Sequence, residues 1–228
     1  MSTSGAISSR DTAGQIILDA LQELQIYGSG NTLKAADSAM ALRRLSWMLK
    51  EWQDDGLNLW RLTSGTVSAS ASPLTLATRM QDVEEARLAL GSPSNYERPL
   101  ERWEWGKYVS LPNKAQAGAA PTIFVFRNEF DNDTGDVSRL YLWPVPSAAV
   151  TINFSGPRVI QDVTDVAQNI DVPQQYTRTV MMNLAAVLAP AFGLANDPNA
   201  IVTIREAARL YQIMRANDRP ASYFLERA

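Results

Sequence analysis

The sequence predicts an α+β protein that is mainly α, with a helical bundle body, an inserted antiparallel β region and an extended C-terminal tail. Two amphipathic helical patterns open the chain, and a helical pattern that is apolar on all sides lies in its last third. Between them lie strand signals and most of the prolines. We therefore expect a flexible N-terminal arm over 1–10, a helical body from 11–56 and 173–217, a β-rich insertion over 57–172, and a tail over 218–228.

The composition excludes several kinds of chemistry. The 228 residues include neither cysteine nor histidine, and the net charge is −3. Disulfides, thiol nucleophiles, thiolate zinc sites, Ser-His-Asp triads and imidazole metal sites are therefore impossible. Carboxylate hydrolases and oxygen-ligated cations remain possible, but no cofactor is expected. The nearly neutral charge disfavours a dedicated nucleic-acid binder.

The sequence shows no secretion signal and no stretch that is long and apolar enough to span a membrane. Residues 1–10 are rich in serine and lack an apolar core segment, so no secretion signal is expected. The longest apolar stretch is Ala185–Ala195, well short of the roughly 20 residues of a membrane span. We expect a soluble protein without a membrane partner.

Two helices are expected at the N-terminus. Thr12 and Gln15 have the spacing of a capping box, and the helix should run from 12 to 27, where a Gly-Ser-Gly-Asn segment follows. A second amphipathic pattern covers 34–55 and stops at Gly56. The short connection makes the pair an antiparallel hairpin.

The middle of the chain has strand signals over 59–67, 122–127, 139–143 and 149–154. Residues 83–90 have a helical composition but lie between strand signals, and we expect a strand there. The polar segment 128–138 is predicted to be a hairpin loop.

The last third returns to helices. Pro173 stands where a first helical turn would begin, and 179–196 carry no charge, which predicts a central helix that Pro190 kinks or ends. Asp197-Pro198 should begin a last helix, over about 198–216, before the break at Asp218-Arg219-Pro220.

Acidic residues give weak signals for a chemical site. The segment Asp131–Asp136 could bind a cation, although its composition is also that of a solvated turn. The pairs Glu84/Glu85 and Glu101/Glu104 could perform acid–base chemistry, although surface carboxylates are the simpler interpretation.

Exposed apolar residues give a stronger signal. Trp47 falls opposite the apolar arc of the second helix, near Met40, Arg43 and Lys50. Trp, Met and Arg are residue types that are enriched in interfaces. We predict a subunit interface there, unless another part of the chain covers it. Tyr223, Phe224 and Leu225 form a possible anchor for another protein, unless the tail folds back.

Several segments follow one another in a distinctive order. They are Thr12–Leu21, Leu42–Trp52, Pro121–Phe126, Leu140–Pro146, and Ile170–Pro173 ahead of an apolar helix that ends at Phe192-Gly193. Their order and spacing resemble those of the tail accessory factor, or head-to-tail adaptor (connector), family of short-tailed bacteriophages, over roughly 12–216.

This resemblance implies a structural virion protein and not an enzyme. Copies would form a ring of about twelve under the portal protein. The ring would extend the DNA channel used in packaging and ejection, contact viral DNA without sequence specificity, and dock the tail tube or nozzle and the tail fibres. The protein would be made in the host cytoplasm and reside at the head–tail junction. Its helical body would pack side by side, and its C-terminal part, with Tyr223–Leu225, would reach the portal.

Two other functions stay open. One is a carboxylate-dependent, virion-associated cell-wall hydrolase that would use Glu85 and Glu101 and would need a glutamate of raised pKa in a cleft. The other is a helical scaffold without a channel.

Overall fold

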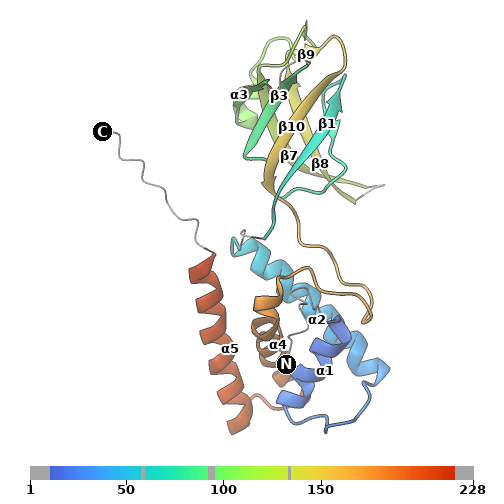
Figure 1. Cartoon of the computed structure of the whole chain (residues 1–228), viewed down its shortest axis with the longest axis vertical. Coiled ribbons are helices and arrows are strands. Elements are labelled where there is room, and N and C mark those ends of the chain that lie inside the picture. Colours follow the sequence, from blue (N-terminus) through green and yellow to red (C-terminus); the bar gives the residue numbers. More distant parts are fainter. Residues whose placement is uncertain (1–10, 58–59, 92–95, 133–134, 219–228) are drawn as a thin grey trace, which may run out of the picture. The chain divides into compact units, whose positions relative to one another are not determined.

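The computed structural model describes residues 11–57, 60–91, 96–132 and 135–218 (Figure 1). The predicted arm and residues 219–228 of the predicted tail lie outside this part. The chain divides into two compact units, one made of Met1–Trp60 with Ile160–Ala228 and the other of Arg61–Val159. Each unit has a hydrophobic core of its own.

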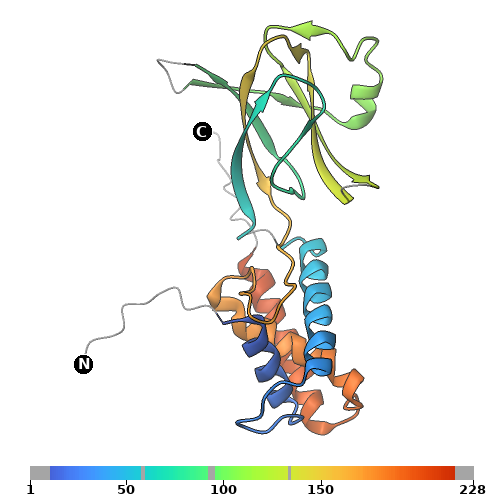
Figure 2. The same ribbon diagram turned by 90° about the vertical axis from the view of Figure 1, so that its right-hand side faces the viewer.

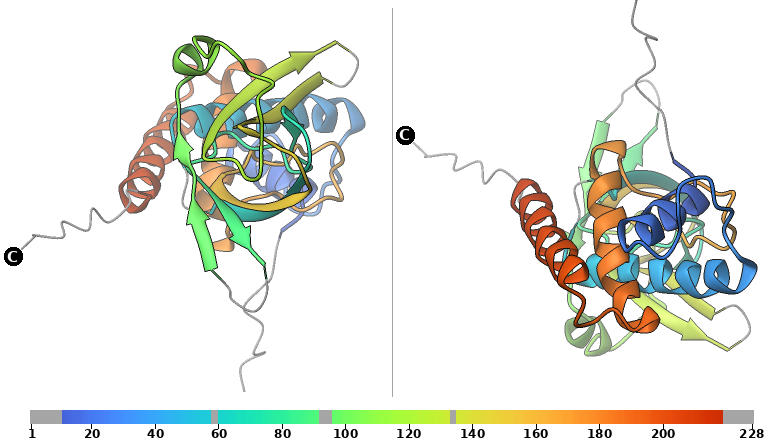
Figure 3. Two further views of the ribbon diagram at one scale, coloured as in Figure 1. Left: turned by 90° about the horizontal axis from the view of Figure 1, so that it is seen from above. Right: turned by 90° about the horizontal axis from the view of Figure 1, so that it is seen from below.

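The first unit is built around one central helix. Helix α4 packs against α1, α2 and α5, and it lies between α1 and α5 when seen from below (Figures 1 and 3). This confirms the prediction of a central apolar helix. The bounds are α1 Ala13–Glu23, α2 Ala35–Asp54, α4 Thr177–Leu188 and α5 Pro198–Asn217, with short 3₁₀ turns η1 Gln174–Tyr176 and η2 Ala189–Phe192.

The predicted capping box begins α1. The backbone N–H of Gln15 donates to Thr12 Oγ1 at 3.3 Å, and the Thr12 N–H donates to Gln15 Oε1 at 2.8 Å. Two backbone donors that the first helical turn cannot satisfy thereby gain acceptors. The cap fixes where the helix starts, and Ile16, Ile17 and Leu21 are fully buried on its inner face.

Thr12→Ala should lower the free energy of unfolding by about 1 kcal/mol, because it removes the acceptor of the capping box. Urea denaturation followed by circular dichroism measures the change. Thr12→Ser is the matched control, since it keeps the hydroxyl and should recover most of the loss. Equal losses for serine and alanine would mean that the methyl group, and not the cap, matters.

The ends of the last two helices follow their sequence signals. Helix α4 stops at Leu188, and Pro190 lies in η2, as predicted. Gly193 closes that turn with a φ of 74°, a value that favours glycine. Asp197 then caps α5 by accepting hydrogen bonds from the backbone N–H groups of Asn199 and Ala200.

An aromatic contact joins α5 to the end of α2. The rings of Tyr211 and Trp52 have centroids 5.4 Å apart, and the Tyr211 hydroxyl donates a hydrogen bond to Asp55. Partial burial, and then this bond to a carboxylate, raise the pKa of Tyr211 to about 12. The neutral phenol is therefore favoured in the folded state.

This pKa shift predicts a pH dependence. A tyrosine in the unfolded chain titrates near pH 10, so the stabilisation by neutral Tyr211 is complete below about pH 10 and is lost as the pH rises to about 12. Wild type should exceed Tyr211→Phe in unfolding free energy at about pH 8, and the difference should shrink between about pH 10 and 12. Urea titrations across this range test it, and a constant difference would contradict it.

The second unit is a sandwich of two β-sheets whose strands are mostly antiparallel (Figure 2). One sheet has the order β1-β10-β3-β4 and the other β2-β8-β7-β5, while β6 and β9 form a small separate pair. The bounds are β1 Leu62–Ala69, β2 Leu74–Thr75, β3 Glu85–Leu90, β4 Tyr96–Pro99, β5 Glu101–Arg102, α3 Trp105–Val109, β6 Ala117–Gly118, β7 Ile123–Asp131, β8 Gly135–Trp143, β9 Val145–Pro146 and β10 Val150–Pro157.

Alternation along the strands builds the core of this unit. Ile152 and Phe154 of β10 face inward, and Phe124 of β7 and Leu140 of β8 meet them from the other sheet. The strand predicted over 83–90 is confirmed by β3, where Ala86 and Leu88 are buried between exposed neighbours. Position between strands was the correct guide there, and helical composition was not.

The predicted fold class is wrong. Helices hold 38% of the described residues and strands 28%, so the protein is mixed, with substantial sheet, and is neither mainly α nor a helical bundle body. The helices of the first unit do not close their core alone, because Leu57, Ile160, Val163, Ile170 and Val172, which lie outside helices, also belong to it. Long periodic helices give a strong local signal, whereas short strands depend on partners far along the chain.

The predicted hairpin loop 128–138 is also too long. Strand β7 continues to Asp131 and β8 begins at Gly135, so most of this polar segment belongs to the ladder. Its polar side chains are accommodated by pairing: Arg139 lies 3.2 Å from Glu129 and 3.6 Å from Asp131. Cross-strand charge pairs can replace apolar contacts on a solvent-facing sheet surface.

Candidate assembly surface

Helix α2 presents a continuous outward stripe, which we call the α2 stripe: Ala36, Met40, Arg43, Trp47, Glu51 and Asp54. These residues fall within an arc of about 80° when each residue advances 100°. Ala41, Leu45, Met48, Leu49 and Trp52 occupy the opposite arc and are buried. One face of α2 therefore packs on the core, and the opposite face is exposed to solvent.

Trp47 is the most unusual member of the α2 stripe. Its side chain is 64% exposed, and Arg43 one turn earlier is exposed as well. Met40 is half-buried and packs partly against the core of its own unit. Because large aromatic side chains are costly to leave in water, a rigid helix that holds one outward is suited to a partner.

Lys50 has a different role from its predicted neighbours. Its ammonium donates to the Ile160 carbonyl at 2.7 Å and lies 2.9 Å from Asp162 Oδ1. Ser46 and Gln53 also bond to this segment, through Val163 O and the Ile160 N–H. Lys50 thus fastens an extended segment to α2, whereas Met40, Arg43 and Trp47 lie together on the outward side.

A second outward stripe was missed by the sequence analysis. We call it the α5 stripe: Val202, Arg205, Arg209, Ile213 and Ala216, again within an arc of about 80°. Val202 is 64% and Ile213 46% exposed. The available signal was that Val202 and Ile213 fall outside the inward arc of Ile204, Ala207 and Met214 and alternate with arginines.

Charge on α5 is mostly basic. Arg209 holds Glu206 with two hydrogen bonds of 2.6 and 2.7 Å, and Arg178 lies 3.5 Å from the same carboxylate. The hydrogen bond from Arg209 is the main reason why the pKa of Glu206 is lowered. Within the described part of the chain, the Arg205 side chain has no hydrogen bond or ion pair.

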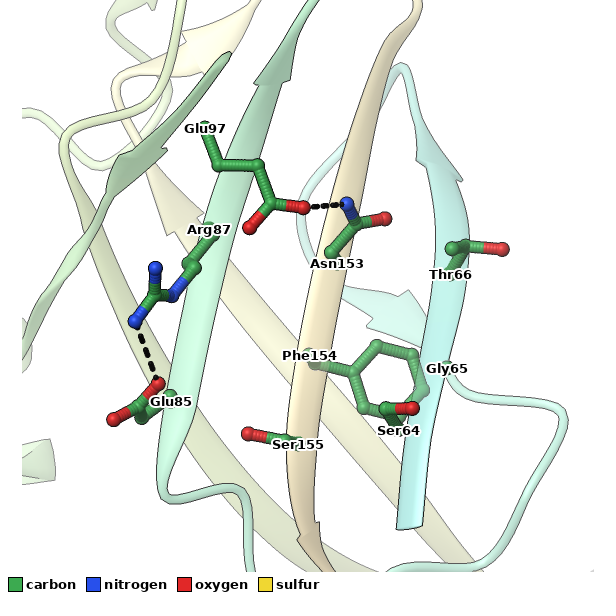
Figure 4. A pocket seen from close by; sticks show the side chains of 9 residues that line it. All are labelled: Ser64, Gly65, Thr66, Glu85, Arg87, Glu97, Asn153, Phe154 and Ser155. Carbon is green, nitrogen blue, oxygen red and sulfur yellow. Dashed lines mark hydrogen bonds and ion pairs between the residues drawn. The ribbon is translucent and has the colours of Figure 1, made fainter. Parts of the chain in front are cut away.

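The sandwich unit carries a polar hollow of about 540 Å³ on the outer face of the β1-β10-β3-β4 sheet (Figure 4). Two pairs occupy it: Arg87 with Glu85 at 3.2 Å, and Asn153, which donates to Glu97 at 2.5 Å. Glu85 and Glu97 are therefore engaged with neighbours. Nearby, the Phe154 ring lies over Gly65, its cross-strand partner, where a Cβ would come within 2.6 Å of the ring.

The carboxylates proposed for a hydrolase are engaged with different partners. Glu85 on β3 pairs with Arg87, and Glu101 on β5 pairs with Lys107. Two neighbouring groups lower the pKa of the Glu101 carboxyl. The larger effect comes from the indole N–H of Trp103, although it lacks the geometry of a hydrogen bond, and the smaller one comes from the Lys107 ammonium at 3.4 Å. A general acid needs the opposite shift. Glu84 donates its backbone N–H to Ser155 O, and Glu104 is the N-cap residue of α3.

The acidic hairpin is neutralised by arginines. Asp136 pairs with Arg79, and Asp131 lies near Arg139. Asp133 is outside the described residues. Among those that are described, no cluster of three acidic side chains could hold a metal ion.

An aromatic cluster that sequence reasoning missed holds α3 on the second sheet. Trp105 lies 5.5 Å from Tyr108 and 5.1 Å from Tyr141, between ring centroids, and the Arg127 guanidinium is 4.0 Å from the Trp105 ring. The cluster is internally satisfied, because Tyr141 also donates to Glu129 at 2.6 Å. It explains the position of α3 without a ligand.

The predicted anchor Tyr223, Phe224 and Leu225 lies outside the described residues. In the part of the chain that is described, no helix combines the length and hydropathy of a membrane span. No protein-family model matches the sequence, and no curated protein is significantly similar to it.

Proposed function

We propose that this chain is a structural virion protein: a head-to-tail adaptor that assembles as a ring under the portal, extends the DNA channel and supports the tail. The observation that carries the proposal is the 64% exposure of Trp47 on a helix whose opposite face is buried. The resemblance to the head-to-tail adaptor family adds the kind of assembly, and α2 belongs to one of the segments that carry the resemblance.

The energetics of Trp47 support assembly. Burying the exposed part of this side chain would remove about 150 Å² from water, worth about 4 kcal/mol before ordering costs. Trp and Arg side by side are typical of the small set of residues that dominate an interface. One such contact is too little for a stable pair, and we expect the isolated chain to be mainly monomeric and to assemble on the portal.

The charge distribution suits a passive channel. A net charge of −3 gives little non-specific attraction for DNA, and a conduit must let DNA slide. The cell-wall hydrolase has no observation in its favour, since Glu85 is paired with Arg87 and the pKa of Glu101 is lowered.

Co-sedimentation with purified portal rings from the same genome tests the proposal. We expect the full chain to pellet with the portal, and a chain that ends at Pro220 to bind less, because Tyr223–Leu225 would be lost. If the shortened chain bound the portal as well as the full chain, the portal-binding surface would lie in the first unit and not in the tail. Absence of binding by the full chain would contradict the proposed function.

A further inference from the structure

The two outward stripes of the first unit differ in charge. The α2 stripe ends in Glu51 and Asp54, and the side chain of neither has a hydrogen bond or ion pair among the described residues. The same is true of the Arg43 side chain. The α5 stripe carries Arg205 and Arg209, and the one carboxylate beside it, Glu206, is already paired. The α2 stripe thus carries two unpaired acids and one unpaired arginine, whereas the charged residues of the α5 stripe are both arginines, of which Arg205 is unpaired.

The stripes also match in apolar content and length. Trp47 is at the centre of one, and Val202 and Ile213 flank the arginines of the other. Each helix has 20 residues and is therefore about 30 Å long. Trp47 can stack on an arginine as well as cover an aliphatic side chain, so both kinds of residue on α5 suit it.

Because the stripes are unlike, a surface that pairs them is not self-complementary. An interface in which one patch meets a different patch is heterologous, and repeated copies of it close into a ring or grow into a filament. The alternative, α2 against α2 of a second copy, would bring Glu51 and Asp54 toward the same residues only if the two helices ran parallel. In either direction it would leave the α5 stripe uncovered.

We propose that the α2 stripe of one copy docks on the α5 stripe of a second copy, so that the chain associates head to tail. The inference deepens the proposed function, on which it rests, by naming the partner of the Trp47 surface. A footprint of about 30 by 10 Å is about 300 Å² per partner, well below the 800 Å² or so of a standard stable interface. Single contacts are therefore weak and become effective when a ring presents them together.

Photo-crosslinking tests the pairing without the portal. A benzophenone amino acid replaces Trp47, the protein is irradiated at about 1 mM so that weak contacts are populated, and peptides of the dimer band are mapped by mass spectrometry. We expect crosslinks to α5 of another copy. The same amino acid at Glu23, an exposed position on α1, is the matched control and should give little dimer.

A charge reversal adds an independent measurement. Arg205→Glu should lower the dimer yield about fivefold, the effect of one surface ion pair, whereas Lys114→Glu in the other unit should not change it. Crosslinks to α2 of another copy, an unchanged yield with Arg205→Glu, or no dimer would each overturn the head-to-tail pairing. If the chain still pellets with the portal, the proposed function survives that failure.

Discussion

Trp47→Ala should leave the fold nearly as stable as wild type and strongly weaken assembly on the portal. The side chain is 64% exposed and is no member of the buried core of its unit, so truncation opens no cavity. Loss of a tryptophan at the centre of an interface typically costs 2 kcal/mol or more, about thirtyfold in affinity for each contact. The same affinity is lost at each subunit contact, so the amount of ring that assembles on the portal should fall steeply.

Two measurements separate the effects of Trp47→Ala. Urea denaturation should give an unfolding free energy within about 0.5 kcal/mol of wild type, as for other surface substitutions. Co-sedimentation should show a large loss of portal-bound protein. The matched control is Trp52→Ala on the same helix, which removes a buried side chain and should cost about 3 kcal/mol of stability. If Trp47→Ala melted like Trp52→Ala, Trp47 would be part of a core.

Gly156→Ala should destabilise the sandwich unit by about 3 kcal/mol, the cost of forcing an extra carbon into a packed interior. A Cβ at Gly156 would lie 2.3 Å from the Asp82 carbonyl oxygen, a backbone atom. That backbone cannot withdraw cheaply, because Gln81 donates its N–H to Pro157 O and Glu84 donates its N–H to Ser155 O. The hydrogen bonds on both sides of Gly156 hold the two segments together.

Hydrogen exchange can locate this damage. Protection should fall over β1, β3 and β10 of the Gly156→Ala protein, while amides of α1, α2 and α4 keep theirs, because each unit has its own core. Gly106→Ala is the matched control: nothing lies within 4 Å of a Cβ there, and alanine favours the helical backbone of α3. Equal hydrogen-exchange protection in the Gly156→Ala and Gly106→Ala proteins would show that the backbone at Asp82 moves aside at little cost.

Local signals predicted the helices well. The capping box of Thr12, the stop at Pro190 and the Asp197 cap each act within one helical turn, so the sequence alone places them. The strands of two residues, such as β5 and β6, carry no alternation to detect and form because distant segments lie beside them. This is why the sequence underestimated the sheet and predicted a mainly α protein.

The outward face of α2 was predictable in part, because helical periodicity is a local signal. A helical wheel places Trp47 and Arg43 outward, and both are exposed. It also placed Lys50 with them, and only the path of the extended segment 160–163 shows that this ammonium bonds to Ile160 and Asp162. The α5 stripe escaped notice because single exposed Val and Ile residues are ordinary on protein surfaces, and their meaning depends on the matching stripe on α2.

The mass of the complex with the portal shows directly whether copies of the chain assemble as a ring under it. Purified portal rings are mixed with an excess of the chain, and single-particle mass measurement compares the rings before and after. We expect one discrete complex, heavier by one 25.1 kDa chain for each portal subunit, with few partly filled rings because neighbouring copies support one another. Portal rings of unchanged mass, in the presence of a correctly folded chain, would contradict it.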